Sequence, residues 1–300
     1  MYLMIKRYAF LVLLIVIVCA SAVYPQRRSV VADLRVHDFK SEVFGNTRTL
    51  RVLVPPGYNG DRTQEYPVLY LNDGQNLFHV GTAQTKNSEW GIDETYKDLL
   101  AYREIEPIII VGIDNAGRSG RANEYLPYFD KYLSPPLPNP QGAKYPNFLA
   151  EEVLPFIEKN YRVKKGAEFT GLGGASYGAL ISLYTAIKKP NVFGKLLLES
   201  PSFYVEDAKI LQEVDETNSL PGTIYVGVGT NEEAKPDCQP GDLSHEAVQD
   251  VLELKKILEA KSFDSKNLKV LIDDCATHSE VAYGRRFTDA MRFLYGRKSP

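Results

Sequence analysis

Apolar runs with the length of a β-strand alternate with longer runs of helical periodicity from residue 49 to residue 295. The predicted strands cover 49–54, 68–71, 107–111, 167–172, 195–198, 223–228 and 268–272. The predicted helices cover 91–102, 148–160, 177–189, 244–261 and 280–295. This alternation is typical of an α/β domain, in which helices cover both faces of a mostly parallel sheet. In such sheets the functional loops follow the carboxyl ends of the strands.

The first 22 residues have the pattern of a secretory signal. Lys6 and Arg7 precede an apolar run over 8–20, and Ala20-Ser21-Ala22 supplies small residues for cleavage. The run is short for a membrane-spanning helix, which needs about 20 residues. We therefore predict a signal peptide over 1–22, a single domain over 23–300 and a secreted or periplasmic location. The alternative is an uncleaved signal-anchor, which would be the only membrane contact.

Composition argues against several classes of protein. Hydrophobic residues make up 44% of the 300 residues and charged residues 24%, which is typical of a globular chain. A net charge of −3 and the lack of a Lys/Arg-rich run argue against a nucleic-acid partner. Three cysteines and four histidines show no usable metal-ligand spacing, so we expect no metal and no cofactor. Nothing in the composition determines the oligomeric state.

A glycine-rich segment joins the predicted strand 167–172 to the predicted helix 177–189. Within it, Gly174-Ala175-Ser176-Tyr177-Gly178 fits the G-x-S-x-G pattern of a nucleophile elbow. The glycines leave room for a tight turn that lifts the serine above the sheet edge. A dinucleotide fingerprint would need glycine at position 176, and a P-loop would need a lysine after the glycines. The remaining alternative is a helix that starts with a capping serine.

The order along the chain limits the choice of base and acid. In folds with this elbow the acid follows the serine and the histidine comes last, which excludes the two histidines before Ser176. His245 opens a predicted helix, whereas His278 lies in the loop after the last strand and is the predicted base. The loop after strand 223–228 supplies the acid, for which Glu232 is our choice and Glu233 the alternative.

Acyl transfer also needs donors for the developing oxyanion. We predict the backbone N–H of Tyr177, directly after the nucleophile, as one donor. The second should come from the loop after an early strand, and there we select the N–H of Gln75, next to Gly74.

Export would leave Cys238 and Cys275 in an oxidising compartment, where a distant pair can form a disulfide. Such a bridge would tie the loop of the predicted acid to the loop of the predicted base. Two unpaired thiols are the alternative, and the sequence does not decide between them.

The stretch 125–145 is rich in proline and therefore predicts a long loop that could cover a binding site. Its aromatic residues Tyr125 and Tyr128, together with Trp90, are candidates for the wall of a substrate pocket. The alternative is that these rings are packed in the core.

Several further motifs follow one another along the chain. They are Val54-Pro-Pro-Gly-Tyr58, Tyr66-Pro-Val-Leu-Tyr70, Asn72-Asp-Gly-Gln-Asn-Leu-Phe78, Trp90-Gly-Ile-Asp-Glu94, Val111-Gly-Ile-Asp-Asn115, the elbow, Ser200-Pro-Ser-Phe203, Val228-Gly-Thr-Asn-Glu232 and His278-Ser-Glu-Val-Ala-Tyr283. With these motifs in this order, the chain resembles the enterochelin-esterase-like family over about residues 33–296. The resemblance implies an α/β-hydrolase three-layer sandwich, with Ser176 as nucleophile, His278 as base and Glu232 as acid. Relatives often have Asp at the acid, and some use a Ser–His pair.

These observations predict a secreted serine esterase that acts through an acyl-enzyme. The resemblance makes a carbohydrate, aromatic or siderophore ester the expected substrate. An acyltransferase of the same fold is one alternative. A catalytically dead hydrolase scaffold that serves as a binding protein is another.

Overall fold

A computed structural model describes residues 33–85 and 88–297. The predicted signal peptide, 1–22, lies outside these residues. The strands are β1 (Leu34–Ser41), β2 (Asn46–Leu53), β3 (Val68–Asn72), β4 (Ile109–Ile113), β5 (Thr170–Ala175), β6 (Lys195–Glu199), β7 (Thr223–Gly229) and β8 (Leu268–Asp273). The helices are α2 (Ile92–Ala101), α3 (Arg121–Tyr125), α4 (Tyr145–Asn147), α5 (Leu154–Asn160), α6 (Tyr177–Lys188), α7 (Lys209–Glu216), α8 (Glu246–Ala260) and α9 (Glu280–Tyr295).

The strands form one sheet in the order β1-β2-β4-β3-β5-β6-β7-β8. β2 runs antiparallel to both β1 and β4, and all other neighbours are parallel. The prediction of a mostly parallel sheet is therefore confirmed. Because β3 to β8 share one direction, their carboxyl ends meet at a single edge, whereas β2 ends at the opposite edge.

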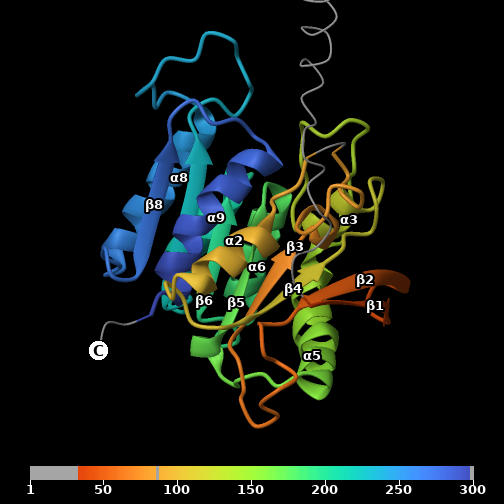
Figure 1. The fold of residues 1–300 in the computed structure, drawn as a ribbon. Coiled ribbons are helices and arrows are strands. Elements are labelled where there is room, and N and C mark those ends of the chain that lie inside the picture. Colours follow the sequence, from red (N-terminus) through yellow and green to blue (C-terminus); the bar gives the residue numbers. More distant parts are fainter. Residues whose placement is uncertain (1–32, 86–87, 298–300) are drawn as a thin grey trace, which may run out of the picture.

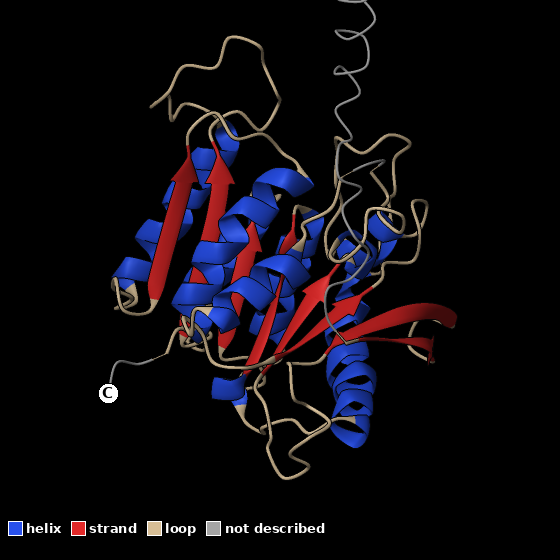
Figure 2. Ribbon diagram, viewed as in Figure 1, coloured by secondary structure: helices blue, strands red, loops and turns tan. Residues whose placement is uncertain are grey.

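Helices cover both faces of the sheet, which gives three layers (Figures 1 and 2). On one face, apolar residues of α2 and α9 pack on inward residues such as Leu69, Leu71 and Leu197. On the other face, α5 to α8 pack on residues such as Tyr70, Leu172 and Val226. The central strands are buried on both sides, in keeping with their nearly continuous apolar sequences.

The sequence-based boundaries need several corrections. β1, α3 and α7 are not among the predicted elements, and β4 begins two residues later than expected. Part of the predicted loop 125–145 is helical, because α4 starts at Tyr145. The predicted helix 148–160 contains a π-helical turn, Phe148–Val153, directly before α5. Pro155 explains it, because proline lacks an N–H and its ring clashes with the carbonyl four residues earlier.

Within residues 33–85 and 88–297, no helix combines the length and the apolar character needed to span a bilayer.

Candidate active site

Ser176 lies at the turn between β5 and α6, at the carboxyl edge of the sheet. Its backbone has φ 59° and ψ −127°, a conformation that is strained for a residue with a side chain and is concentrated at functional sites. Gly174 makes this turn possible. A Cβ at that position would lie 2.9 Å from the backbone carbonyl of Gly178. The local geometry is therefore that of the predicted elbow.

His278 and Glu232 are in direct contact. The imidazole Nδ1 is 2.6 Å from Oε2 of Glu232. The other carboxylate oxygen of Glu232, Oε1, accepts hydrogen bonds from the hydroxyl of Ser200 and the N–H of Gly229, both at 2.7 Å. Glu233 points elsewhere, since its exposed carboxylate pairs with Lys235. The contact with the imidazole thus belongs to Glu232 and not to Glu233.

The charge of Glu232 is stabilised although its side chain is only 5% exposed. Burial alone would raise the pKa of this carboxyl group. The hydrogen bond and charge of His278, and the donors Ser200 and Gly229, outweigh burial and lower the pKa below its ordinary value. Glu232 is therefore an ionised acceptor for the imidazole at neutral pH.

Ser176 and His278 line the same pocket, which has a volume of about 360 Å³. Among the described residues, the hydroxyl of Ser176 is within hydrogen-bond distance of that of Ser202, at 3.2 Å, and not of the imidazole of His278. The pocket therefore brings together the predicted nucleophile and base. Its other lining residues are Asp73, Asn76, Gln84, Thr85, Ser88, Trp90, Arg121, Ala175, Ser279, Glu280 and Tyr283.

The two predicted oxyanion donors occupy different surroundings. Tyr177 is the first residue of α6, where a helical N–H has no intrahelical carbonyl partner. Gln75 is buried in the 3₁₀ turn Gly74–Asn76, and its side-chain Oε1 accepts a hydrogen bond from the N–H of Asn115. The neighbours of Gln75, Asp73 and Asn76, line the pocket. The assignment of both N–H groups stays a prediction.

Of the three residues predicted to wall the substrate pocket, the structure places one in the pocket and two in the core. Trp90 lines the pocket, with its ring against Tyr283. Tyr125 is fully buried, and its hydroxyl accepts a hydrogen bond from the N–H of Asp73. Tyr128 is buried against Tyr184. The prediction that Tyr125 and Tyr128 wall the pocket is therefore wrong, because their rings fill the core instead.

An ion pair that the sequence reasoning missed forms one side of the pocket. Arg121 of α3 donates two hydrogen bonds, each 2.8 Å long, to the two carboxylate oxygens of Asp73. Burial alone would lower the pKa of Arg121, but the Asp73 carboxylate raises it above its ordinary value. Asn115 also donates to Asp73. These contacts fix the start of the predicted oxyanion loop, and no local sequence pattern marked Arg121 for this role.

A disulfide joins Cys238 and Cys275, with their Cα atoms 5.7 Å apart. The structure thus contains the bridge that the sequence left open. It connects the segment that follows Glu232 to the loop that carries His278. Within the described residues, no three or more His, Cys, Asp or Glu side chains are grouped so that they could hold a metal ion.

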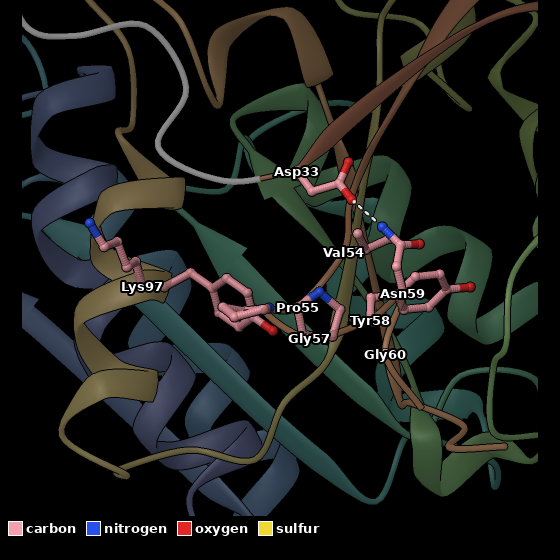
Figure 3. A pocket seen from close by; sticks show the side chains of 10 residues that line it. Asp33, Val54, Pro55, Gly57, Tyr58, Asn59, Gly60 and Lys97 are labelled. Atoms are coloured by element: carbon pink, nitrogen blue, oxygen red, sulfur yellow. Dashed lines mark hydrogen bonds between the residues drawn. The ribbon is translucent and has the colours of Figure 1, made fainter. Parts of the chain in front are cut away.

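A second pocket of similar size, about 340 Å³, lies beyond the end of β2 (Figure 3). Pro55, Tyr58 and Lys97 are among its lining residues, and Asn59 donates a hydrogen bond to Asp33 there. Because β2 runs antiparallel to the central strands, this pocket is at the sheet edge opposite Ser176. Its described lining residues include no serine, cysteine or histidine that could form a nucleophile–base combination, so the chemistry points to the first pocket.

The family comparison agrees with this geometry. A family model described as "Putative esterase" matches residues 41–294. The chain belongs to this esterase family. The match spans β2 to α9 and includes every residue of the site described above. The resemblance inferred from the sequence is thereby confirmed, and the protein is a carboxylic ester hydrolase.

Individual relatives support the same fold. The uncharacterized protein YjcH of Bacillus subtilis is 30% identical over 227 residues, which cover 75% of this chain and 84% of YjcH. A ferulic acid esterase structure has a TM-score of 0.64 at 17% identity and covers 87% of this chain and 97% of its own. The enterobactin esterase FES from Shigella flexneri, solved in the presence of enterobactin, has a TM-score of 0.66 at 19% identity. The match covers 90% of this chain and 61% of the FES chain. The fold is that of the α/β-hydrolases, as predicted.

Proposed function

We propose that this esterase is a serine hydrolase that uses Ser176 as nucleophile, His278 as general base and Glu232 as the acid of a triad. One observation carries the proposal. A strained serine at a strand–helix turn opens into the same pocket as a histidine whose Nδ1 contacts a buried carboxylate. Triads are recognised by this geometry and these roles rather than by sequence position.

The reaction is a two-step acyl transfer. The hydroxyl of Ser176 first exchanges Ser202 for Nε2 of His278 as its partner, and His278 takes the proton as Ser176 attacks the ester carbonyl. Glu232 holds the proton of Nδ1 and stabilises the imidazolium. The N–H groups of Tyr177 and Gln75 bind the oxyanion, the alcohol leaves with the proton from His278, and water then releases the acid.

The pocket suggests a polar ester as substrate. Its wall offers the hydroxyls of Thr85 and Ser88, the carboxylate of Glu280 and the guanidinium of Arg121, whereas Trp90 supplies one aromatic surface. Carbohydrate esters, feruloyl esters and siderophore esters all combine hydroxyl groups with an ester carbonyl. The relatives named for ferulic acid and enterobactin make these the first esters to test.

Export is part of the proposal. The bridge between Cys238 and Cys275 is of the kind that persists in oxidising compartments and is rare in the cytosol. It supports a secreted or periplasmic enzyme with a cleaved signal over 1–22. Mass spectrometry of the protein recovered outside the cytoplasm tests this directly, because an N-terminus near Val23 is expected and an intact Met1 would contradict it.

The catalytic proposal is tested by Ser176→Ala. We expect turnover of a p-nitrophenyl ester to fall by about 10⁵-fold or more, because knocking out the nucleophile of a triad has effects of this size. Labelling by a fluorophosphonate should disappear while the melting temperature stays close to that of the wild type. A variant that retains wild-type turnover would refute the proposal. The wild type should then be assayed with acetylated xylo-oligosaccharides, methyl ferulate and enterobactin to identify the ester.

A further inference from the structure

A buried ion pair lies directly behind Glu232. Nε of Arg286, on α9, donates to Oε2 of Glu199, at the end of β6, over 2.7 Å, and the two side chains are 1% and 0% exposed. The pair fits only because residue 227 of β7 is glycine, since a Cβ there would lie 2.5 Å from Glu199 and 2.8 Å from Arg286. Burying two charges is costly and seldom adds stability by itself. The position of the pair therefore calls for a reason other than stability.

Ser200 connects this ion pair to the predicted acid. Its hydroxyl is 3.1 Å from Nη2 of Arg286 and 2.7 Å from Oε1 of Glu232. A guanidinium can only donate, so the Ser200 oxygen must accept from Arg286. The single proton of the hydroxyl is then left for Glu232. The direction of both hydrogen bonds is thus fixed by chemistry, and the positive charge of Arg286 polarises the hydroxyl toward the carboxylate.

The backbone of Ser200 is strained to reach this position. Ser200 has φ 40°, in the left-handed region that favours glycine. Its N–H donates to the carbonyl of Gly227 over 2.7 Å, which extends the pairing of the parallel strands β6 and β7 by one residue beyond Glu199. A non-glycine residue kept at positive φ in a buried turn is the kind of strain that clusters at functional sites.

We propose that Ser200, supported by the Arg286–Glu199 pair, is a positioning residue that fixes the Glu232 carboxylate for His278. With Ser200 and Gly229 on Oε1, only Oε2 is left for the imidazole. The proposal rests on the catalytic triad proposed above and adds to it a second layer of contacts from β6 and α9.

Loss of the Ser200 hydroxyl should change the pH dependence of catalysis in one direction. The charged and titratable groups around Glu232 are His278, Arg286 and Tyr283 of α9, and Glu199 of β6. Asp273 of β8 acts on Glu232 indirectly, because it pairs with Arg286. Removing the Ser200 donor makes the Glu232 carboxylate more basic, so the His278–Glu232 pair takes up a proton at higher pH. Activity needs the unprotonated pair, and the acid limb of the kcat/KM profile should therefore move to higher pH.

Two substitutions of Ser200 separate an effect on the position of Glu232 from an effect on folding. Ser200→Ala removes the hydroxyl, and Ser200→Gly removes it while also relieving the positive φ. We expect both to lower kcat for a p-nitrophenyl ester about tenfold, the size of one hydrogen bond to a charged group, with KM within about twofold. The acid limb should shift upward relative to that of the wild type. Ser200→Gly should unfold no more easily than Ser200→Ala.

Ser41→Ala is the matched control. Ser41 is likewise a buried serine whose hydroxyl donates to a glutamate, Glu152, over 2.6 Å, but it lies on the edge strand β1. It should lose stability without a change in kcat or in the pH profile. If both Ser200 variants keep the wild-type kcat and acid limb, the positioning role is refuted. If Ser176→Ala remained active, the triad itself would be refuted instead, so the two failures can be told apart.

Discussion

Ser176 is held by the regular strand and helix on either side of it and by one backbone hydrogen bond to β6, whereas Glu232 and His278 lie on two loops that hold each other. The nucleophile half of the site, residues 170–188, is one strand, one turn and one helix. The base–acid half consists of residues 229–233 and 273–279. There Thr230 N–H bonds to the carbonyl of Asp273, and Asn231 N–H to that of Ala276.

The two halves of the site position their catalytic side chains in different ways. In the nucleophile half, the strained Ser176 is fixed by backbone hydrogen bonds to the first turn of α6, and by the bond from its own N–H to the carbonyl of Glu199 on the adjacent strand β6. In the base–acid half, two side chains 46 residues apart meet only if the two loops cross correctly. Hydrogen bonds between the loops, the Cys238–Cys275 bridge and the Ser200 contact all reinforce that crossing. Substitutions in the two halves should therefore fail in different ways.

The largest effect in the base–acid half is expected for Glu232→Gln. Oε1 of Glu232 already accepts from Ser200 and Gly229, so the amide nitrogen of glutamine must face Nδ1 of His278. An N–H facing Nδ1 stabilises the tautomer with its proton on Nε2, which cannot accept the proton of Ser176. We expect kcat to fall by about 10³–10⁴-fold, as found when a triad acid becomes an amide.

Glu233→Gln is the matched control for this prediction. Its carboxylate is exposed and pairs with Lys235, a contact that is worth little at a surface. The variant should keep kcat within twofold. Steady-state kinetics of the Glu232→Gln and Glu233→Gln variants test which glutamate is the acid of the triad. Equal losses in the two variants, or none in Glu232→Gln, would mean that a Ser–His pair suffices or that the acid lies elsewhere.

The same contrast explains what the sequence could predict. The parallel sheet and the elbow follow from local patterns: apolar runs mark the central strands, and Gly174 and Gly178 flank Ser176. β1 was missed because residues 34–41 are mixed in polarity at an edge of the sheet. The wrong assignment of Tyr125 and Tyr128 has a related cause, since composition cannot tell a buried aromatic ring from one that walls a pocket.

Contacts between distant segments were hardest to predict. His278 could be selected because the order of the three residues along the chain left few choices. The pairing of Arg121 with Asp73 and the path from Arg286 through Ser200 to Glu232 had no such guide. In each case the partners come from separate elements, and only the sheet order brings them together. Sequence reasoning therefore recovers the chemical groups more readily than the residues that hold them.

A smaller effect is expected for Gly174→Ala, which tests the nucleophile half. The added methyl group would lie 2.9 Å from the backbone of Gly178 and 3.0 Å from Cβ of Asn72. Relief requires the turn at Ser176 to move, and a displacement of about 1 Å at a reacting group costs roughly 100-fold in rate. Gly222→Ala is the control, because its nearest contact would be 3.9 Å away. Kinetics and thermal unfolding of both variants should separate a moved nucleophile from a general loss of stability.

The smallest effect on rate is expected when the Cys238–Cys275 bridge is removed. The bridge closes a loop of 37 residues, so loop-closure entropy gives a loss of about 3–4 kcal/mol in the free energy of unfolding for the double Cys→Ser variant. The turn at Ser176 does not depend on this loop, and the hydrogen bonds between the two loops remain. We therefore expect kcat to fall only about threefold, the equivalent of less than 1 kcal/mol in the barrier.

A thiol reductant provides the matched comparison for the bridge. Dithiothreitol should lower the stability and rate of the wild type toward those of the double variant and leave the variant itself unchanged. Chemical denaturation and initial rates measure the two effects separately. If reduction abolished activity at a temperature where the protein stays folded, the bridge, rather than the backbone contacts between the loops, would be what brings His278 to Ser176. The contrast between a locally fixed nucleophile and a base held by several redundant contacts would then have to be abandoned.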